Sequence, residues 1–179
     1  MKQSKTADYA YLAGVVDCDG CIQIKKFRQG NSFQYDCTIL TNQVDSGAID
    51  YLHGRFGGKV YRNNRYNPSP THKQIVYRWE VRGQEAADIA KRIAPFLRIK
   101  KAQAQLLVRY RDIQNHQMRI PRGRGHPLEP HEVALREECY LEMKKLKSII
   151  VPSAAVTTKC GDSSETMGSD SLALEEEEL

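Results

Sequence analysis

Hydrophobic and polar residues follow two periodicities that predict short helices and strands in a regular order along the chain. Apolar residues at helical spacing indicate helices, and strict alternation indicates strands that are buried on one side. The predicted helices cover residues 8–17, 46–55, 85–93, 101–113 and 129–148. The predicted strands cover residues 21–28, 33–41, 59–66 and 72–82. The first seven elements have the order αββαββα, which favours an α+β fold with a curved, four-stranded antiparallel sheet and helices on one face.

Each predicted strand has one apolar side and one polar side. In the first strand, for example, Ile22 and Ile24 alternate with Gln23 and Lys25. Helices would cover the apolar side, and the polar side would remain open, either to water or to a ligand. Its Gln, Lys, Arg, Asn and Thr side chains are types that contact DNA base edges and phosphates. The predicted DNA-contacting residues are Gln23, Lys25, Gln34, Asp36, Thr38, Arg62, Asn64, Gln74 and Arg78.

The uneven distribution of charge strengthens the case for nucleic acid. Residues 1–128 carry 22 Lys and Arg and 10 Asp and Glu, a net charge of +12, whereas residues 129–179 carry 5 and 12, a net charge of −7. A positive block of this size is typical of a polyanion-binding protein. We divide the chain into a main domain (1–115), a basic loop and helix (116–150) and an acidic tail (151–179) that we expect to be disordered.

Composition also excludes several classes of protein. The chain has no run of 18 apolar residues and no apolar segment after Lys2 and Lys5 that is typical of a signal peptide, so we expect no membrane association. Its five cysteines are odd in number and scattered, which favours a reducing compartment, cytoplasmic or organellar, over secretion. Cys18 and Cys21 form a single C-x-x-C pair, which supplies only two of the four ligands of a zinc site.

The first predicted helix runs directly into a pair of carboxylates. We expect Asp8 to cap its start, and Asp17 and Asp19 stand at its C-terminal end, where backbone carbonyls lack partners. Such hard oxygen ligands suit Mg²⁺. Gly20 is expected to end the helix with a positive φ. The alternative interpretation is that both aspartates only terminate a core helix.

Three segments of the chain resemble the LAGLIDADG homing endonucleases. Residues 12–20, which read LAGVVDCDG, are similar to the family signature. Residues 94–103, which read APFLRIKKAQ, resemble the proline-phenylalanine-leucine and lysine segment late in the same fold. A third likeness is residues 40–43, followed by a helix and residues 56–60. The resemblance covers roughly residues 8–113 and implies the αββαββα fold and a metal-dependent double-strand break in a long, near-palindromic DNA site.

The resemblance also implies roles for particular residues. The implied catalytic residues are Asp19, Gln43 and Lys100, and the implied Mg²⁺ ligands are Asp19 and the backbone carbonyl of Cys18. Asn42 and Lys101 are the alternatives to Gln43 and Lys100 if the alignment slips by one residue. The resemblance gives Asp17 a structural role.

The chain contains one copy of the motif, and in this family single-motif chains act as homodimers. The resemblance implies that the first helix pairs with its copy through Leu12, Ala13, Gly14 and Val16. Two copies would span double-stranded DNA of about 20 base pairs. Two alternatives remain open: a non-cleaving binder on the same fold, either an intron-splicing maturase with an RNA partner or a transcription regulator, and a purely structural basic domain.

Overall fold

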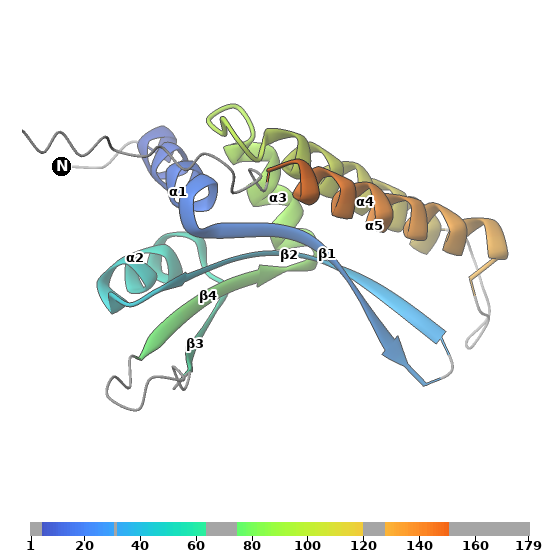
Figure 1. Ribbon diagram of the computed structural model, residues 1–179, viewed down its shortest axis with the longest axis horizontal. Helices are drawn as coiled ribbons and strands as arrows, with labels where there is room; N and C mark the ends of the chain where they lie inside the picture. Colours follow the sequence, from blue (N-terminus) through green and yellow to red (C-terminus); the bar gives the residue numbers. More distant parts are fainter. Residues whose placement is uncertain (1–4, 31, 64–74, 120–127, 151–179) are drawn as a thin grey trace, which may run out of the picture.

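The computed structural model describes residues 5–30, 32–63, 75–119 and 128–150 and contains nine elements in those segments (Figure 1). The helices are α1 (Lys5–Asp19), α2 (Ser46–Phe56), α3 (Gly83–Ile93), α4 (Lys101–Arg119) and α5 (Pro130–Ile150). The strands are β1 (Gly20–Gln29), β2 (Ser32–Gln43), β3 (Lys59–Asn63) and β4 (Val76–Arg82). The predicted order αββαββα is confirmed, and α4 and α5 follow it.

The four strands form one antiparallel sheet in the order β1-β2-β4-β3. The helices lie on one face of the sheet, and the strands curve away from them into an arch (Figure 1). This arrangement confirms the predicted fold class. The other face, which no helix covers in Figure 1, is called the open face below.

Strand alternation determines which side chains enter the core. Ile22 of β1, Ile39 of β2 and Val81 of β4 lie side by side in register, and all three are buried under the helices. Trp79, two residues before Val81, is fully buried and its indole nitrogen donates to the Gly57 carbonyl oxygen at 2.8 Å. That bond satisfies the one polar group of the largest core side chain, so the indole ring is buried without an unpaired donor.

The start of α1 is bound to α2. Asp8 lies in the first turn of α1, not before it, because the helix already begins at Lys5. Its buried carboxylate accepts from the Tyr51 hydroxyl at 2.7 Å and from Arg55, both on α2. The hydrogen bond from Tyr51, together with the Arg55 charge, holds the pKa of Asp8 below its ordinary value. The predicted capping role of Asp8 is therefore replaced by a tertiary contact.

Gly20 connects α1 to β1, and the space available at this position requires a glycine. Its φ is not among the positive values, which in the described residues belong to Gly30, Gly57, Gly58 and Gly83, so the predicted positive φ is wrong. A Cβ atom at Gly20 would lie 2.5 Å from the Cα of Val16. The strand can leave the helix this closely only because residue 20 has no side chain.

The C-terminal helices belong to the same core. The predicted boundary at residue 115 falls inside α4, which extends to Arg119. Cys139 and Met143 of α5 are buried in the core cluster, and Glu137 of α5 accepts from Lys26 of β1 at 2.7 Å and from the Tyr35 hydroxyl of β2. The predicted acidic tail lies outside the described residues. Among the helices described, none is long and apolar enough to cross a membrane.

We predict that Met143→Ala lowers the free energy of unfolding of the whole protein by about 2–5 kcal/mol, because it leaves a cavity between α5 and the core. Leu141, on the same helix, is 47% exposed, so Leu141→Ala should change that free energy by less than about 0.5 kcal/mol. Urea unfolding followed by circular dichroism measures both values. Equal effects of the two substitutions would show that α5 is not part of the cooperative core.

Candidate functional site

The C-terminal end of α1 is bound to the turn that precedes α4. The Asp17 carboxylate accepts hydrogen bonds from the backbone amides of Arg98 at 2.7 Å, Ile99 at 3.3 Å and Lys100 at 3.0 Å. These amides lie ahead of the first turn of α4, where backbone N–H groups lack helical partners. Asp17 therefore acts as a structural acceptor, which agrees with the role that the resemblance implies.

Lys100 completes this contact in the opposite direction. Its Nζ donates to three backbone carbonyl oxygens, those of Val16 at 2.7 Å, Asp17 at 2.8 Å and Gly20 at 3.0 Å. A cation at this position neutralises the negative end of the α1 dipole. An ammonium group has three hydrogens, and all three have acceptors here. In this conformation the implied contact of Lys100 with a scissile phosphate would require one of these bonds to break.

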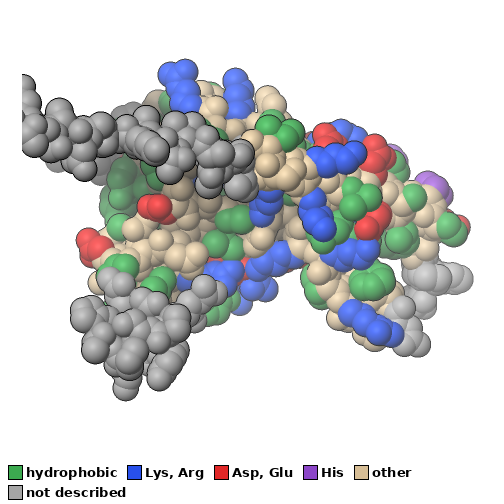
Figure 2. Space-filling view, viewed as in Figure 1, with side chains coloured by type: hydrophobic (Ala, Val, Ile, Leu, Met, Phe, Trp, Pro, Cys, Tyr) green, Lys and Arg blue, Asp and Glu red, His purple; other side chains and the backbone are tan. Residues whose placement is uncertain are grey.

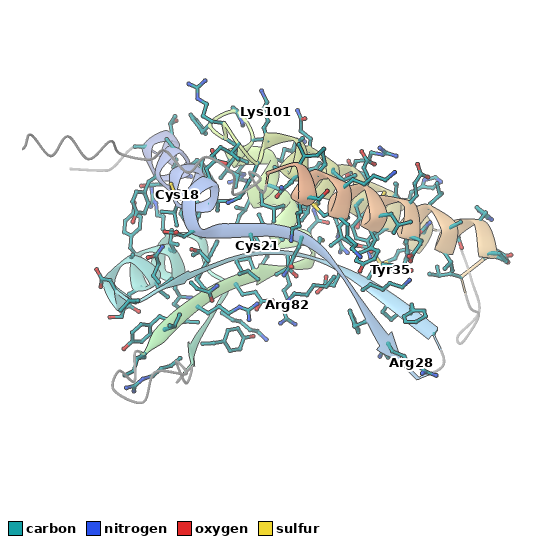
Figure 3. All side chains as sticks on the ribbon, in the orientation of Figure 1. Cys18, Cys21, Arg28, Tyr35, Arg82 and Lys101 are labelled. Carbon is teal, nitrogen blue, oxygen red and sulfur yellow. The ribbon has the colours of Figure 1, made fainter. Side chains whose placement is uncertain are left out.

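Lys101, the alternative to Lys100, is exposed. Figure 3 shows it at the top of the view, whereas Arg82 projects below the sheet. The two residues therefore lie on opposite sides of the molecule, and Lys101 is far from the open face.

Asp19 is the last residue of α1, and its carboxylate is exposed. Gln43, the last residue of β2, donates from Nε2 to Asp19 Oδ2 at 3.0 Å. The predicted pair is thus brought together from residues 24 positions apart. Asn42, the alternative to Gln43, points to the open face in register with Arg78. One oxygen of Asp19 is held by an amide while the carboxylate as a whole faces solvent.

The donor set at this end of α1 fits a divalent cation only in part. Asp19 and the Cys18 carbonyl are oxygen ligands of the kind that Mg²⁺ prefers. In the part of the chain that the structure describes, no group of three or more His, Cys, Asp or Glu side chains could hold a metal ion. The implied ligands are therefore suitable in type, but one copy of the described chain contributes a single exposed carboxylate from the motif.

The open face of the sheet carries most of the predicted DNA-contacting residues. Register places Gln23 of β1 opposite Thr38 of β2, and Lys25 opposite Asp36. Lys and Arg side chains gather on this underside of the sheet in Figure 2. The predicted residues that lie on the open face are Gln23, Lys25, Gln34, Asp36, Thr38 and Arg78. Thr38 is fully buried there, so its side chain is less accessible than the sequence suggests.

Three predicted DNA-contacting residues are placed differently. Arg62 of β3 is in register with Tyr77, so it lies on the face opposite to that of Arg78. Its assignment to the open face is therefore wrong. Asn64 and Gln74 lie outside the described residues.

A cluster that the sequence did not predict lies at the centre of the open face. Glu80 of β4 is only 3% exposed and is surrounded by Lys25, Arg78 and Arg82. Burial raises its pKa, but hydrogen bonds from Arg82 and Lys25 outweigh this effect, and the pKa of Glu80 is lowered overall. We call these four residues the Glu80 cluster. Alternation along β4 indicated that these residues share a face, but not that Lys25 of β1 reaches them.

The face of α1 that is free for a partner also differs from the prediction. Leu12, Ala13 and Val16 are at most 1% exposed because they pack against the chain's own core, so they cannot form the predicted interface between copies. Gly14 is exposed, and a Cβ atom added there would have no neighbour within 4 Å. The exposed residues that share its side of α1 are Ala7, Ala10, Tyr11 and Cys18.

Comparison with solved structures supports the fold. The homing endonuclease I-CvuI, in complex with its target in the presence of Ca, matches with a TM-score of 0.61 and 18% identity over 79% of this chain and 82% of that chain. The archaeal intron-encoded homing endonuclease I-Vdi141I, complexed with DNA, matches with a TM-score of 0.61 and 12% identity over 80% of this chain and 86% of that chain.

A longer protein also contains a region with a fold similar to that of this chain. The LAGLIDADG homing endonuclease I-GzeII, in complex with a DNA target, matches with a TM-score of 0.56 and 14% identity over 76% of this chain and 43% of that chain. No protein-family model and no curated protein sequence matches this chain. The chain thus has the fold of the LAGLIDADG homing endonucleases, as the sequence resemblance predicted.

We predict that Asp17 and Asp19 differ in their contribution to stability. Asp17→Asn should lower the free energy of unfolding by about 1–3 kcal/mol, because the amide is a weaker acceptor for three backbone N–H groups. Asp19→Asn should change it by less than about 0.5 kcal/mol, because the Asp19 carboxylate is exposed. Chemical denaturation of the two variants compares them directly, and a larger loss for Asp19→Asn would contradict the assignment of the structural role.

Proposed function

We propose that this chain is a site-specific homing endonuclease that cuts both strands of a long, near-palindromic DNA site as a homodimer. The pairing of Asp19 with Gln43 is the observation that supports it most strongly. An exposed carboxylate at a helix end is oriented by the last residue of β2, the strand that also carries Gln34 and Asp36 on the open face. β2 would therefore connect a cleavage site at its end to a DNA-reading face, although Gln43 itself is in register with Tyr77 on the other side of the strand.

The divalent ion would be held by Asp19 and by the backbone carbonyl of Cys18. When bound, Mg²⁺ would supply a Lewis acid for the scissile phosphate and lower the pKa of an attacking water. The chain's own contribution is to orient Asp19 through Gln43 and to fix the end of α1 through Asp17 and Lys100. The similar I-CvuI complexes were obtained in the presence of Ca or of Mg, which is consistent with the use of a divalent cation.

The exposed side of α1 would form the interface between two copies. Small residues at Ala7 and Gly14 allow two helices to approach closely, and Tyr11 adds an exposed aromatic ring. A second copy would bring a second Asp19 to the site and complete the donor set that a single chain lacks. The match to I-GzeII, which involves less than half of that chain, is consistent with two such units acting together.

A second candidate is a non-cleaving nucleic-acid binder on the same fold, with intron RNA or DNA as its ligand. The observation that favours it is the engagement of Lys100 by three backbone carbonyls, which leaves no free hydrogen on Nζ for a phosphate. This candidate predicts sequence-selective binding without strand cleavage.

Cleavage of a randomised palindromic DNA library in the presence of Mg²⁺ tests the proposed activity. The wild-type protein should cut members that share one site of about 20 base pairs. Asp19→Asn should reduce cleavage by more than about 100-fold, because it removes the charged metal ligand. Asp50→Asn, which changes an exposed carboxylate on α2, should leave cleavage unchanged.

The outcomes separate the two candidates. Selective retention of DNA or RNA without any cut by the wild type would replace the endonuclease with the non-cleaving binder. Equal cleavage by the wild type and Asp19→Asn would show that Asp19 is not part of the catalytic site, whichever residues supply the nuclease activity.

We predict that Gly14→Leu converts the dimer to a monomer, because the added side chain would hold the two α1 helices apart. It should not unfold the protein, since a Cβ at residue 14 meets no atom within 4 Å. Gly54→Leu is a matched control, because Gly54 is also an exposed helical glycine with nothing within 4 Å of an added Cβ, but it lies on α2. Sedimentation equilibrium of the three proteins should show a mass change for Gly14→Leu alone. A Gly14→Leu variant that remains dimeric would place the interface elsewhere.

A further inference from the structure

A buried acid at the centre of a basic surface requires a physical explanation. Glu80 lies on the open face with its side chain only 2% exposed, so its carboxylate is not presented to a ligand. A negative charge there opposes the approach of DNA phosphates and would by itself weaken binding. Glu80 is therefore expected to contribute something that a neutral residue would not.

The contacts of Glu80 indicate what that contribution is. Its Oε1 accepts from Lys25 Nζ at 3.0 Å and from Arg82 Nε at 2.7 Å, and its Oε2 lies 3.3 Å from Arg78 Nε. Lys25 comes from β1 and the two arginines from β4, so the carboxylate holds cations from strands that are not adjacent in the sheet. Three long side chains are thereby held in defined positions.

Arg82 is the cation of the cluster best placed to meet a ligand. Its side chain is 53% exposed, compared with 34% for Lys25 and 24% for Arg78. Glu80 binds it through Nε, so the two terminal nitrogens are the outward end of the guanidinium. That pair of donors matches the O6 and N7 acceptors of guanine in the major groove. Figure 3 shows Arg82 projecting below the sheet, away from the helices.

The surroundings of Arg82 are hollow enough to admit a base edge. Arg82 and Lys25 line an open hollow of about 490 Å³ together with Gln23, Asp36, neighbouring residues of β1 and Tyr140 of α5. Polar groups of both signs converge there, which is typical of a surface that discriminates between base edges, since phosphate binding requires only positive charge. The hollow lies at β1 on the edge of the sheet, and Gln23, Lys25, Asp36 and Arg82 form the part of its lining on the face that the proposed function assigns to DNA.

We propose that Arg82 is a specificity-determining residue that recognises a guanine in each half of the DNA site, and that Glu80 is the positioning residue that prepares it. This inference rests on the proposed function and names two residues that carry its sequence specificity. Arg82 loses less side-chain entropy on binding when Glu80 already holds it, which favours the one base that fits its fixed orientation.

Glu80 also suppresses binding to other sequences. Cations that are paired with a carboxylate are less available to neutralise phosphates, and phosphate neutralisation supplies most of non-specific affinity. Removal of the Glu80 charge should therefore strengthen binding to unrelated DNA while it weakens the preference for the correct base. A residue that only stabilised the sheet would have neither effect.

Selection of bound DNA from a randomised library, in Ca²⁺ or without metal, tests the inference separately from cleavage. The full-length protein is compared with Glu80→Gln, Arg82→Lys and the matched control Glu137→Gln. Glu137 also pairs with a lysine of β1, but Lys26 is on the helix-covered side of the strand. Circular dichroism melting of each variant confirms that it is folded.

The wild type and Glu137→Gln should select the same site, with guanine at one symmetric position. Arg82→Lys, which keeps the charge but not the fork of donors, should reduce the preference for that guanine about tenfold. Glu80→Gln should reduce preference at the same position, raise affinity for unrelated DNA and steepen the salt dependence of that affinity.

Two results would overturn the inference, and they have different meanings. If the wild type selects a site and both Glu80→Gln and Arg82→Lys select it equally well, the Glu80 cluster has no part in specificity and the proposed function stands. If the wild type selects no sequence at all, the proposed function fails and this inference fails with it. Should Glu80→Gln not fold, the result for Arg82→Lys decides alone, because Arg82 is exposed.

Discussion

The candidate site depends on the reciprocal contact between the C-terminal end of α1 and residues 98–100. Asp17 accepts from three backbone amides of that segment, and Lys100 returns three hydrogen bonds to backbone carbonyls around the helix end. Each side chain satisfies backbone groups that regular structure leaves without partners. The contact determines the direction in which the chain leaves α1. It thereby holds Asp19 at the surface although Asp17 and Lys100 are engaged internally.

The open face is organised by a similar principle. Glu80, like Asp17, is an acid whose oxygens are occupied by donors of the same chain. At the helix end the backbone hydrogen bonds of Asp17 leave Asp19 exposed, and on the sheet the ion pairs of Glu80 leave the Arg82 side chain about half exposed. The residues that meet the solvent are therefore a selected subset of the charged residues, and residue type alone does not identify them.

Alternation predicted the faces of β1, β2 and β4 correctly because side-chain direction in a strand follows from whether a position is odd or even. The face predicted for Arg62 of β3 is wrong because it depends on the register with β4. The family resemblance also assigned Asp19 and Gln43 to one site, since it carries information about tertiary position that periodicity lacks. The buried side of α1 could not be predicted in the same way. Its core-facing and exposed sides are both small or apolar, as Leu12 and Tyr11 illustrate, so the helix has no clear polar face. The Glu80 cluster depends on the registers of three strands and on side-chain reach, which local sequence does not specify.

The contacts of α5 have a consequence for how recognition by this protein can evolve. Glu137 holds Lys26 and Tyr35 on the helix-covered side of the β1–β2 hairpin, and their neighbours Lys25 and Asp36 point to the open face. Adjacent residues of a strand share one backbone, so a shift of α5 rotates the side chains on both faces together. Substitutions that displace α5, unlike Glu137→Gln, which keeps the size of the side chain, are thus a route by which lineages can diverge in recognition while the open-face residues themselves stay the same.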